Sequence, residues 1–239
     1  MRRFYAPPDA FNGGRVSLSE EEARHLRSVL RMVPGDRVRV FDGEGLEFIC
    51  EIAEITRRGA ELRVIESAEP PAPESPLRLI LAAAVTKGDK FDLVIQKAVE
   101  LGVSHFVPLI TARCDVKLRD VAKRHERWNK VVLEASKQSG RATLMPVDMP
   151  ISLDDLLREA SGGQLLFFSE AGGNSLGEID SAGGLTAVVG PEGGWDPAEI
   201  EAAKRAKALV ITLAGRVLRA ETAAIAIAAI LQHRFGDLS

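Results

Sequence analysis

The sequence predicts an α/β protein in two parts, a small β-rich barrel followed by a mostly parallel sheet whose strands alternate with helices. Short β-type runs with one helical pattern fill the first 70 residues, and from residue 77 apolar runs alternate with helical patterns. Between them, residues 67–76 contain four prolines, each of which removes a backbone donor and disfavours helix before it. We therefore expect a first domain at 1–70, a linker at 71–76 and a second domain at 77–239.

The first domain is expected to hold five strands and one helix. Pro-Gly at 34–35 and Asp-Gly at 42–43 are turn signals between β-type runs. Ser19 and Glu22 match a capping box, and apolar residues follow at helical spacing up to Leu30. The predicted strands cover residues 2–6, 15–18, 37–41, 46–55 and 60–66. A unit of this size with five strands and one helix favours a small barrel.

The second domain is expected to be a mostly parallel α/β sheet, because buried strands alternate with helices. The predicted strands cover residues 77–85, 103–109, 144–147, 164–168, 185–189 and 209–213. The helical patterns lie at about 91–101, 119–138, 152–160, 197–207 and 219–235. Asp196, Pro197 and Glu199 mark one helix start with an N-cap, a proline and an acid in the first turn.

Composition and charge narrow the classes of protein. The chain has 239 residues, 46% hydrophobic and 27% charged, which excludes disordered, collagen-like and disulfide-scaffold classes. The net charge of −3 does not by itself predict a nucleic-acid or membrane partner, but residues 113–141 hold nine basic and four acidic side chains. Such a stretch is either an RNA-binding surface or a solvated charged face.

Neither a metal site nor a membrane segment is predicted. Cys50 and Cys114 lie far apart and form no Cys-x-x-Cys pair. Residues 1–5 are not followed by the apolar segment of a signal peptide, and the longest apolar run, 223–231, is too short to span a bilayer. We therefore expect a cytoplasmic protein that binds no metal and no membrane.

One hydrolase pattern competes with the other signals. Residues 173–177 match Gly-x-Ser-x-Gly with Ser175, and His233 follows in the chain order of an α/β-hydrolase. The aspartates between them are Asp180 and Asp196. This nucleophile needs a strand that runs straight into a sharp turn, whereas six residues separate Phe168 from Ser175. The serine hydrolase is therefore the weaker interpretation.

The stronger signal is a pair of glycine-bearing segments after predicted strands. The strands at 185–189 and 209–213 are followed by the segments 190–195 and 214–223. α/β proteins bind ligands at this carboxyl edge of the sheet, and glycine lets the backbone approach a ligand closely. The second segment also carries Arg216, Arg219 and Glu221. One such segment alone is as well explained by an ordinary turn, but two together favour a ligand site.

Blocks of residues in this order along the chain resemble the RsmE-type 16S rRNA (uracil-N3)-methyltransferases of the SPOUT (α/β-knot) superfamily. The blocks are Arg2–Tyr5, His25–Arg31, Gly35-Asp36, Lys87–Lys90, Gln96–Gly102, Glu134–Arg141, Gly190–Gly194 and Leu218–Ala223. The resemblance implies a SPOUT trefoil-knot methyltransferase domain preceded by a small PUA-like β-barrel that binds RNA. It also implies a homodimer whose active sites use both chains, with the apolar last helix at the interface. Periodicity alone favours an open doubly wound sheet.

The resemblance further implies that S-adenosylmethionine is held by three loops, mainly through their main chain. The matching residues are Leu166, Ser169, Glu170, Gly190, Glu192, Gly193, Gly194, Leu213, Ala214, Leu218 and Thr222. Ala214-Gly215 departs from the family, in which glycine is usually followed by proline or a polar residue. This departure leaves the loop geometry at Ala214 open.

The implied reaction is methyl transfer to N3 of a specific uridine in small-subunit ribosomal RNA. The weakly acidic N3–H needs a base, and Glu221 and Glu192 are the carboxylates of the two segments. Equally, Glu221 can cap the last helix and Glu192 can order its own turn. We take Glu221 as the catalytic carboxylate and Arg219 as the group that stabilises the uracil anion.

RNA contacts are expected from basic and polar side chains along the chain. They are Arg2, Arg3, Lys87, Lys90, Gln138, Arg141 and Arg216. The expected substrate is free small-subunit RNA or the assembled 30S subunit. Two alternatives stay open: a SPOUT methyltransferase that acts on another RNA nucleotide, and a non-catalytic RNA-binding protein.

Overall fold

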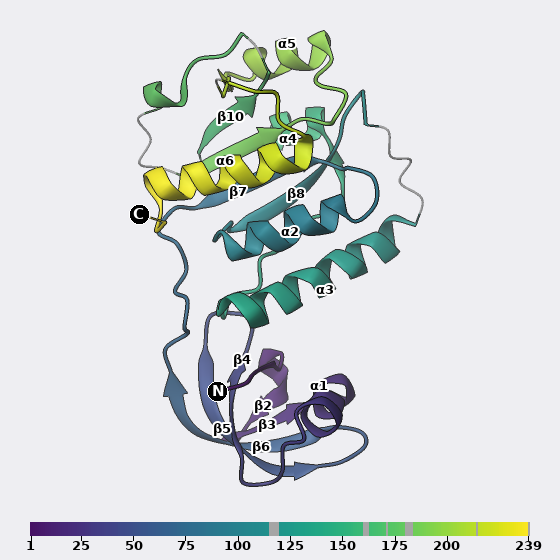
Figure 1. The fold of residues 1–239 in the computed structure, drawn as a ribbon, viewed down its shortest axis with the longest axis vertical. Helices are drawn as coiled ribbons and strands as arrows, with labels where there is room; N and C mark the ends of the chain where they lie inside the picture. The colour runs from purple at the N-terminus through teal and green to yellow at the C-terminus, as the bar shows by residue number, and fades with distance from the viewer. Residues whose placement is uncertain (115–119, 160–162, 171, 180–183, 214, 239) are drawn as a thin grey trace. The chain divides into compact units, whose positions relative to one another are not determined.

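A computed structural model of the chain describes residues 1–114, 120–159, 163–170, 172–179, 184–213 and 215–238 (Figure 1). It consists of two compact units. The N-terminal unit comprises Met1–Glu74 and Leu133–Leu144, and the C-terminal unit comprises Ser75–Val132 and Met145–Ser239. The sequence gives no sign that Leu133–Leu144 belongs with the N-terminal unit.

The N-terminal unit is a six-stranded sheet in the order β1-β4-β5-β6-β3-β2, in which β1 and β4 run parallel and the other pairs antiparallel. The strands are β1 (Arg3–Tyr5), β2 (Phe11–Asn12), β3 (Arg15–Leu18), β4 (Arg37–Phe41), β5 (Glu47–Ile55) and β6 (Ala60–Ala68), with a 3-10 helix η1 (Pro8–Ala10) before β2. Five of these strands are predicted from the sequence. The two-residue strand β2 is not.

One core joins the two ends of this sheet. Phe4 of β1 and Leu18 of β3 belong to the same buried cluster as Leu26. Because β1 and β3 are well separated in the strand order, the sheet must curl around this core, as Figure 1 shows. Two register irregularities between β5 and β6 accompany the curl. The predicted small barrel is thus a curled six-stranded sheet.

The helix of the N-terminal unit begins after its predicted cap, but the capping box is only half formed. Ser19 Oγ accepts a hydrogen bond from the Glu22 amide at 3.3 Å. The Glu22 carboxylate binds Lys137 Nζ instead of returning to the cap, and burial raises its pKa. Helix α1 (Glu20–Arg24) then continues into a π-helical turn, η2 (His25–Val29).

The C-terminal unit is the predicted parallel sheet, in the order β12-β10-β11-β7-β8-β9. The strands are β7 (Leu79–Ala84), β8 (His105–Ile110), β9 (Ile151–Ser152), β10 (Gln164–Phe168), β11 (Leu185–Val189) and β12 (Leu209–Ile211). This order places the carboxyl ends of β10, β11 and β12 side by side. The loops that follow these three strands therefore meet at one edge.

Helices cover both faces of the parallel sheet. They are α2 (Lys90–Glu100), α4 (Leu153–Glu159), α5 (Pro197–Arg205) and α6 (Ala220–Phe235), with a 3-10 helix η3 (Leu176–Glu178). Helix α3 (Val121–Ser139) begins in this unit, where Trp128 contacts Phe91 of α2, and ends in the N-terminal unit. Helices α2 and α6 lie side by side, and α6 packs on β7 and β11 (Figure 1). Successive residues of β8 show the two faces. The ring of Phe106 contacts Phe91 of α2 at a centroid distance of 5.5 Å, whereas Val107 shares a cluster with Leu156 of α4 and Ala203 of α5.

One predicted strand is wrong. Residues 144–147 form no strand, and the continuous ladder beside β8 begins only at β9, which pairs with Leu109 and Ile110. Pro146 has no N–H to donate, so the segment makes only an isolated bridge between Val147 and Phe106. The apolar run at this position reflects burial rather than a strand.

Within the described ranges, no helix is both long and apolar enough to cross a membrane.

Candidate active site

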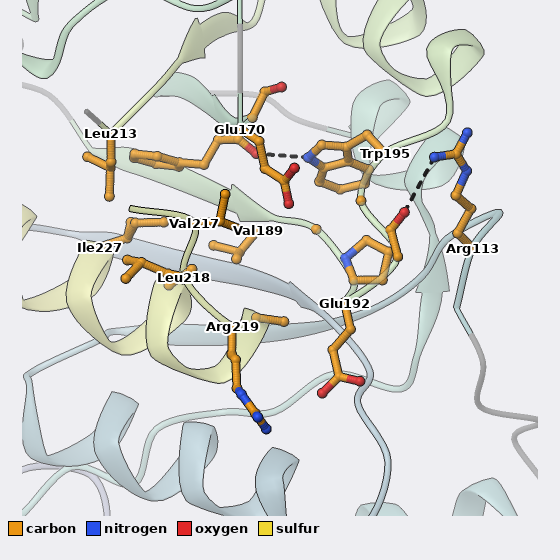
Figure 2. A pocket seen from close by; sticks show the side chains of 18 of the residues that line it. Arg113, Glu170, Val189, Glu192, Trp195, Leu213, Val217, Leu218, Arg219 and Ile227 are labelled. Atoms are coloured by element: carbon orange, nitrogen blue, oxygen red, sulfur yellow. Dashed lines mark hydrogen bonds between the residues drawn. The ribbon is translucent and has the colours of Figure 1, made fainter. Parts of the chain in front are cut away.

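A cavity of about 790 Å³ lies where the loops after β10, β11 and β12 meet the start of α6. This volume falls in the range of about 300–1,000 Å³ that is usual for small-molecule sites. Figure 2 shows that Val189, Leu213, Val217, Leu218 and Ile227 gather on one side, whereas Arg113 and Glu192 lie on the other. The cavity therefore has an apolar wall and a charged wall.

Trp195 fixes the loop after β11. Its indole Nε1 donates a hydrogen bond to the carbonyl of Phe168 at 2.8 Å (Figure 2). The centroids of the Trp195 and Phe167 rings are 4.3 Å apart. A Cβ on Gly190 would lie 2.8 Å from the Trp195 ring. Glycine at 190 is therefore required by the tryptophan beside it, a reason that the glycine pattern alone does not reveal.

The same loop closes in a turn that Arg113 braces. The Gly194 amide donates to the Pro191 carbonyl at 3.0 Å, and Gly194 has a φ of +69°, which favours glycine. Arg113 Nη1 donates to the Gly193 carbonyl at 3.4 Å, and its Nη2 lies 3.5 Å from Asp196 Oδ2. Arg113 follows the carboxyl end of β8, so its position at this edge is the signal that could have added it to the predicted site.

The loop after β12 is held against the segment after β10. The Ser169 amide donates to the Ile211 carbonyl at 2.9 Å, and the Thr212 amide donates to the Asn174 carbonyl at 3.0 Å. Beyond this pairing, Gly215 has a φ of +110° and lines the cavity together with residues 216–219. The chain thus passes from β12 along the cavity into α6.

A cluster of opposite charges lies beside the cavity, here called the Lys90 cluster: Lys90, Glu192 and Glu221. Lys90 Nζ binds Glu192 Oε1 and lies 3.5 Å from Glu221 Oε1. The hydrogen bond from Lys90 lowers the pKa of Glu192, with help from the charges of Arg219 and Lys87. The same bond raises the pKa of Lys90. Among the described residues, no hydrogen-bond partner reaches the buried Glu221 Oε2.

Most of the predicted cofactor residues line this cavity. They are Ser169, Glu170, Gly190, Glu192, Gly193, Gly194, Leu213 and Leu218, together with the predicted catalytic Arg219 and the predicted RNA contacts Lys90 and Arg216. Leu166 is buried within β10, Thr222 is exposed on α6, and Glu221 meets the cavity only through Lys90. Ala214 lies outside the described residues.

Sequence reasoning missed four residues of the cavity: Arg113, Val189, Ile200 and Ile227. Apart from Lys90, the other lining residues fall in the predicted segments around the ends of β10, β11 and β12. Three of the four are apolar side chains at the end of a buried strand or on a helix. Periodicity marks such residues as core and does not distinguish a core residue from the wall of a cavity.

Two of the predicted RNA contacts are buried in ion pairs of the N-terminal unit. Arg141 is 3% exposed and its Nη2 lies 2.6 Å from Glu74 Oε2. Arg3 Nη2 lies 2.8 Å from the buried Glu47 Oε2, and its guanidinium stacks 4.6 Å from the Phe41 ring centre. These two arginines have structural roles. Arg2, Lys87 and Gln138 are exposed.

The serine hydrolase pattern is not a catalytic site. Ser175 precedes the short helix η3 without a capping hydrogen bond from its side chain, and Asn174 pairs with Ile211 rather than leaving a strand through a sharp turn. His233 Nδ1 lies 2.7 Å from the carbonyl of Leu238. Asp180 lies outside the described residues, and Asp196 caps α5 in a full capping box with Glu199, as predicted.

No cluster of potential metal ligands occurs among the residues that the structure describes.

The chain is similar to known proteins along nearly its whole length. Residues 73–232 match a family described as RNA methyltransferase domain, and residues 18–65 match one described as RNA methyltransferase PUA domain. Ribosomal RNA small subunit methyltransferase E of Rickettsia conorii is 34% identical over 93% of this chain and 91% of that protein.

Two solved structures share this fold from end to end. A ribosomal RNA small subunit methyltransferase E from Neisseria gonorrhoeae, bound to S-adenosyl methionine, is 36% identical with a TM-score of 0.92, and the match covers 100% of both chains. A putative methyltransferase from Legionella pneumophila, in complex with the bound cofactor SAM, is 34% identical with a TM-score of 0.92 over 99% of this chain and 98% of that one.

Proposed function

The chain belongs to the family of RNA methyltransferases that carry a PUA domain, and on this premise we propose that it methylates N3 of a uridine in 16S ribosomal RNA with S-adenosylmethionine as methyl donor. The observation that carries the proposal is the cavity of about 790 Å³ at the carboxyl edge of β10, β11 and β12. Its residues belong to the part of the chain that matches SAM-bound relatives over their full length.

The residues of the cavity fit this cofactor. The side chains of Val189, Leu213, Leu218 and Ile227 offer an apolar wall for a flat base, and the turn at 191–194 presents backbone groups for hydrogen bonds. A glycine at 190 keeps the loop next to Trp195 free of a Cβ. When bound, S-adenosylmethionine supplies a methyl group on a positively charged sulfur.

The predicted cofactor residues that line the cavity are retained in the proposal, and Ala214 is kept as a prediction. Leu166 is assigned a supporting role within β10, because it is fully buried. Thr222 is exposed on α6 and lies outside the cavity lining, so its contact with the cofactor remains a prediction. The knotted passage of the chain is likewise kept as a prediction.

The catalytic proposal concerns the proton on uracil N3. A base must take this proton while the ring is held opposite the methyl donor. Glu192 is the weaker choice, because its ion pair lowers its pKa and so its basicity. Glu221 has an oxygen with no partner among the described residues and sits on the first turn of α6. Arg219 lines the cavity and can stabilise negative charge on the uracil ring.

The proposed substrate is small-subunit ribosomal RNA, free or within the 30S subunit. We assign RNA binding to the PUA-like domain at 1–70 and the methyltransferase to 77–239, with 71–76 as the linker. Arg2, Lys87, Gln138 and Arg216 are exposed and remain the proposed RNA contacts. Exposed phosphate-binding side chains make RNA affinity strongly salt-dependent.

We also propose a homodimer formed through α6, in the cytoplasm. Ala224, Ile227, Ala228 and Leu231 are buried within the C-terminal unit, whereas the apolar Ile230 is 37% exposed on the same helix. A helix that is apolar on every face needs a second surface to cover it. The sedimentation of the purified chain tests the dimer directly.

Replacing Arg219 with alanine is expected to lower the turnover number about 100-fold to 1,000-fold at saturating RNA, because charge stabilisation of the uracil anion is lost. Arg219 makes no side-chain cap to α6, so the helix should be retained. The assay is transfer of labelled methyl groups from S-adenosylmethionine to 16S RNA and to 30S subunits. Arg205→Ala, an exposed arginine at the end of α5, is the matched control.

Full turnover by Arg219→Ala would remove this residue from the mechanism. If the unaltered protein binds the cofactor but modifies a different nucleotide, the uridine assignment is wrong. If it binds RNA without any methyl transfer, the chain is a non-catalytic RNA-binding protein.

A further inference from the structure

Lys90 contacts carboxylates from two different segments of the C-terminal unit. It is the first residue of α2, and its Nζ binds Glu192 Oε1 and lies 3.5 Å from Glu221 Oε1. Glu192 belongs to the turn at 191–194, and Glu221 belongs to the first turn of α6. One ammonium group therefore joins the loop after β11 to the start of α6.

Both of these segments are walls of the cavity. Glu192, Gly193 and Gly194 line it from the loop, and Arg219, Ala220 and Ala223 line it from the start of α6. Lys90 itself lines it as well. The contacts of Lys90 with both carboxylates therefore tie two walls of the cavity to the start of α2.

The position of Lys90 is itself fixed from α3. Arg127 Nη2 donates to Asp89 Oδ1 at 2.6 Å, and its Nε donates to Asp92 Oδ2 at 2.5 Å. One guanidinium therefore binds an aspartate before Lys90 and an aspartate after it. Phe91, the next residue, is 1% exposed, and its ring packs against that of Trp128 with a centroid distance of 5.1 Å. The start of α2 is thus a rigid support for the ammonium group.

Two carboxylates already occupy the Lys90 ammonium. Lys90 faces both Glu192 and Glu221, although the positive charges of Lys87 and Arg219 also act on Glu192. An RNA phosphate at this point would have to displace a carboxylate from the lysine.

We propose that Lys90 is a positioning residue for the cofactor, which holds the turn at 191–194 and the start of α6 in their binding arrangement, rather than a contact to RNA phosphate. This inference rests on the proposed function. It assigns to the Lys-Gly-Asp-Lys segment at 87–90 a role at the cofactor cavity.

The test compares S-adenosylmethionine binding by calorimetry in the full-length protein and its variants. Lys90→Met is expected to raise the Kd about fivefold to tenfold, the size expected for losing a partly exposed ion pair that orders a loop. Lys90→Arg keeps the charge and should stay within about threefold of the unaltered protein. Lys97→Met removes a lysine of the same helix that, within the described residues, pairs with Glu100 at 2.7 Å and lies outside the cavity lining, and it should leave the Kd unchanged.

A double-mutant cycle separates positioning from a general loss of stability. If Lys90 acts through Glu192, then Glu192→Gln alone raises the Kd. Lys90→Met should then raise the Kd by a smaller factor in the Glu192→Gln background than in the unaltered protein. Thermal unfolding of each variant checks that the fold is retained. Should Lys90→Met fail to fold, Lys90→Gln takes its place in the same cycle.

The opposite result is specific. An unchanged cofactor Kd in Lys90→Met and in Glu192→Gln, with a raised KM for RNA and a salt dependence reduced by about one phosphate contact, would make Lys90 an RNA contact and overturn the inference. If the unaltered protein does not bind S-adenosylmethionine at all, the proposed function fails instead. The two failures are therefore distinguishable.

Discussion

Replacing Gly190 with alanine is expected to weaken S-adenosylmethionine binding about tenfold to 100-fold, which corresponds to the cost of about 1–3 kcal/mol for forcing an extra methyl group into a packed site. The new Cβ would lie 2.8 Å from the Trp195 ring. That ring cannot move aside freely, since it stacks on Phe167 and its Nε1 donates to the Phe168 carbonyl. The loop at 190–195 must shift instead, and this loop is part of the cavity wall.

Calorimetric titration with S-adenosylmethionine measures this effect. Gly177→Ala is the matched control, because a Cβ there meets only the Ser175 hydroxyl at an ordinary 3.4 Å and residue 177 lies outside the cavity lining. Equal cofactor affinity in Gly190→Ala and the unaltered protein would mean that the loop at 190–195 does not hold the cofactor.

Replacing Glu47 with glutamine is expected to destabilise the N-terminal unit by about 3 kcal/mol, because it leaves buried positive charge without a counter-ion. The Glu47 side chain is fully buried, and its two oxygens lie 2.8 Å from Arg3 Nη2 and 3.0 Å from Arg39 Nη1. The Arg3 side chain is itself only 9% exposed. The Arg39 side chain is 25% exposed, so the loss falls mainly on Arg3, which solvent hardly reaches.

Hydrogen exchange of the amides of β4, β5 and β6 measures the stability of this unit directly. Glu51→Gln is the matched control on the same strand, since its partner Arg63 is 63% exposed and such surface pairs contribute less than about 1 kcal/mol. If Glu47→Gln were no more destabilising than Glu51→Gln, the buried ion pairs would not be what holds β1 in the sheet.

Much of the fold follows from sequence periodicity. The apolar runs that became β7, β8, β10 and β11 are continuous because both faces of the parallel sheet are covered by helices. Where periodicity failed, a single residue explains the failure: Pro146 interrupts the run at 144–147, which is apolar through burial alone. The grouping of Leu133–Leu144 with the N-terminal unit depends on distant contacts that no local pattern encodes.

The sequence pattern predicts the glycines of the candidate site but not the side chains that hold their loop in place. Residues 190–194 are visible as a motif, but glycine is required at 190 because the ring of Trp195 lies beside it. Trp195, in the loop after β11, is held there by its hydrogen bond to the Phe168 carbonyl at the end of β10. Arg113, which follows β8, contacts the same loop, although in the sequence it is visible only as part of a basic stretch. Contacts between the loops of different strands depend on the order of the strands in the sheet. No single segment of the sequence determines that order.

Charge counting was the least reliable guide to function. Of the arginines predicted to touch RNA, Arg3 and Arg141 are buried beside Glu47 and Glu74. Lys90 is shared between two carboxylates at the cavity. A count of charges along the chain gives no information on whether each positive charge already has a carboxylate next to it.

Transfer of a methyl group to N3 of a uridine in small-subunit ribosomal RNA can be checked in a strain that lacks this protein, by mass spectrometry of the nucleosides of its 16S RNA. We expect 3-methyluridine to be lost in this strain, to return with a copy of the unaltered gene, and to return weakly or not at all with a Gly190→Ala copy. Full retention of 3-methyluridine in the strain without the protein would contradict it.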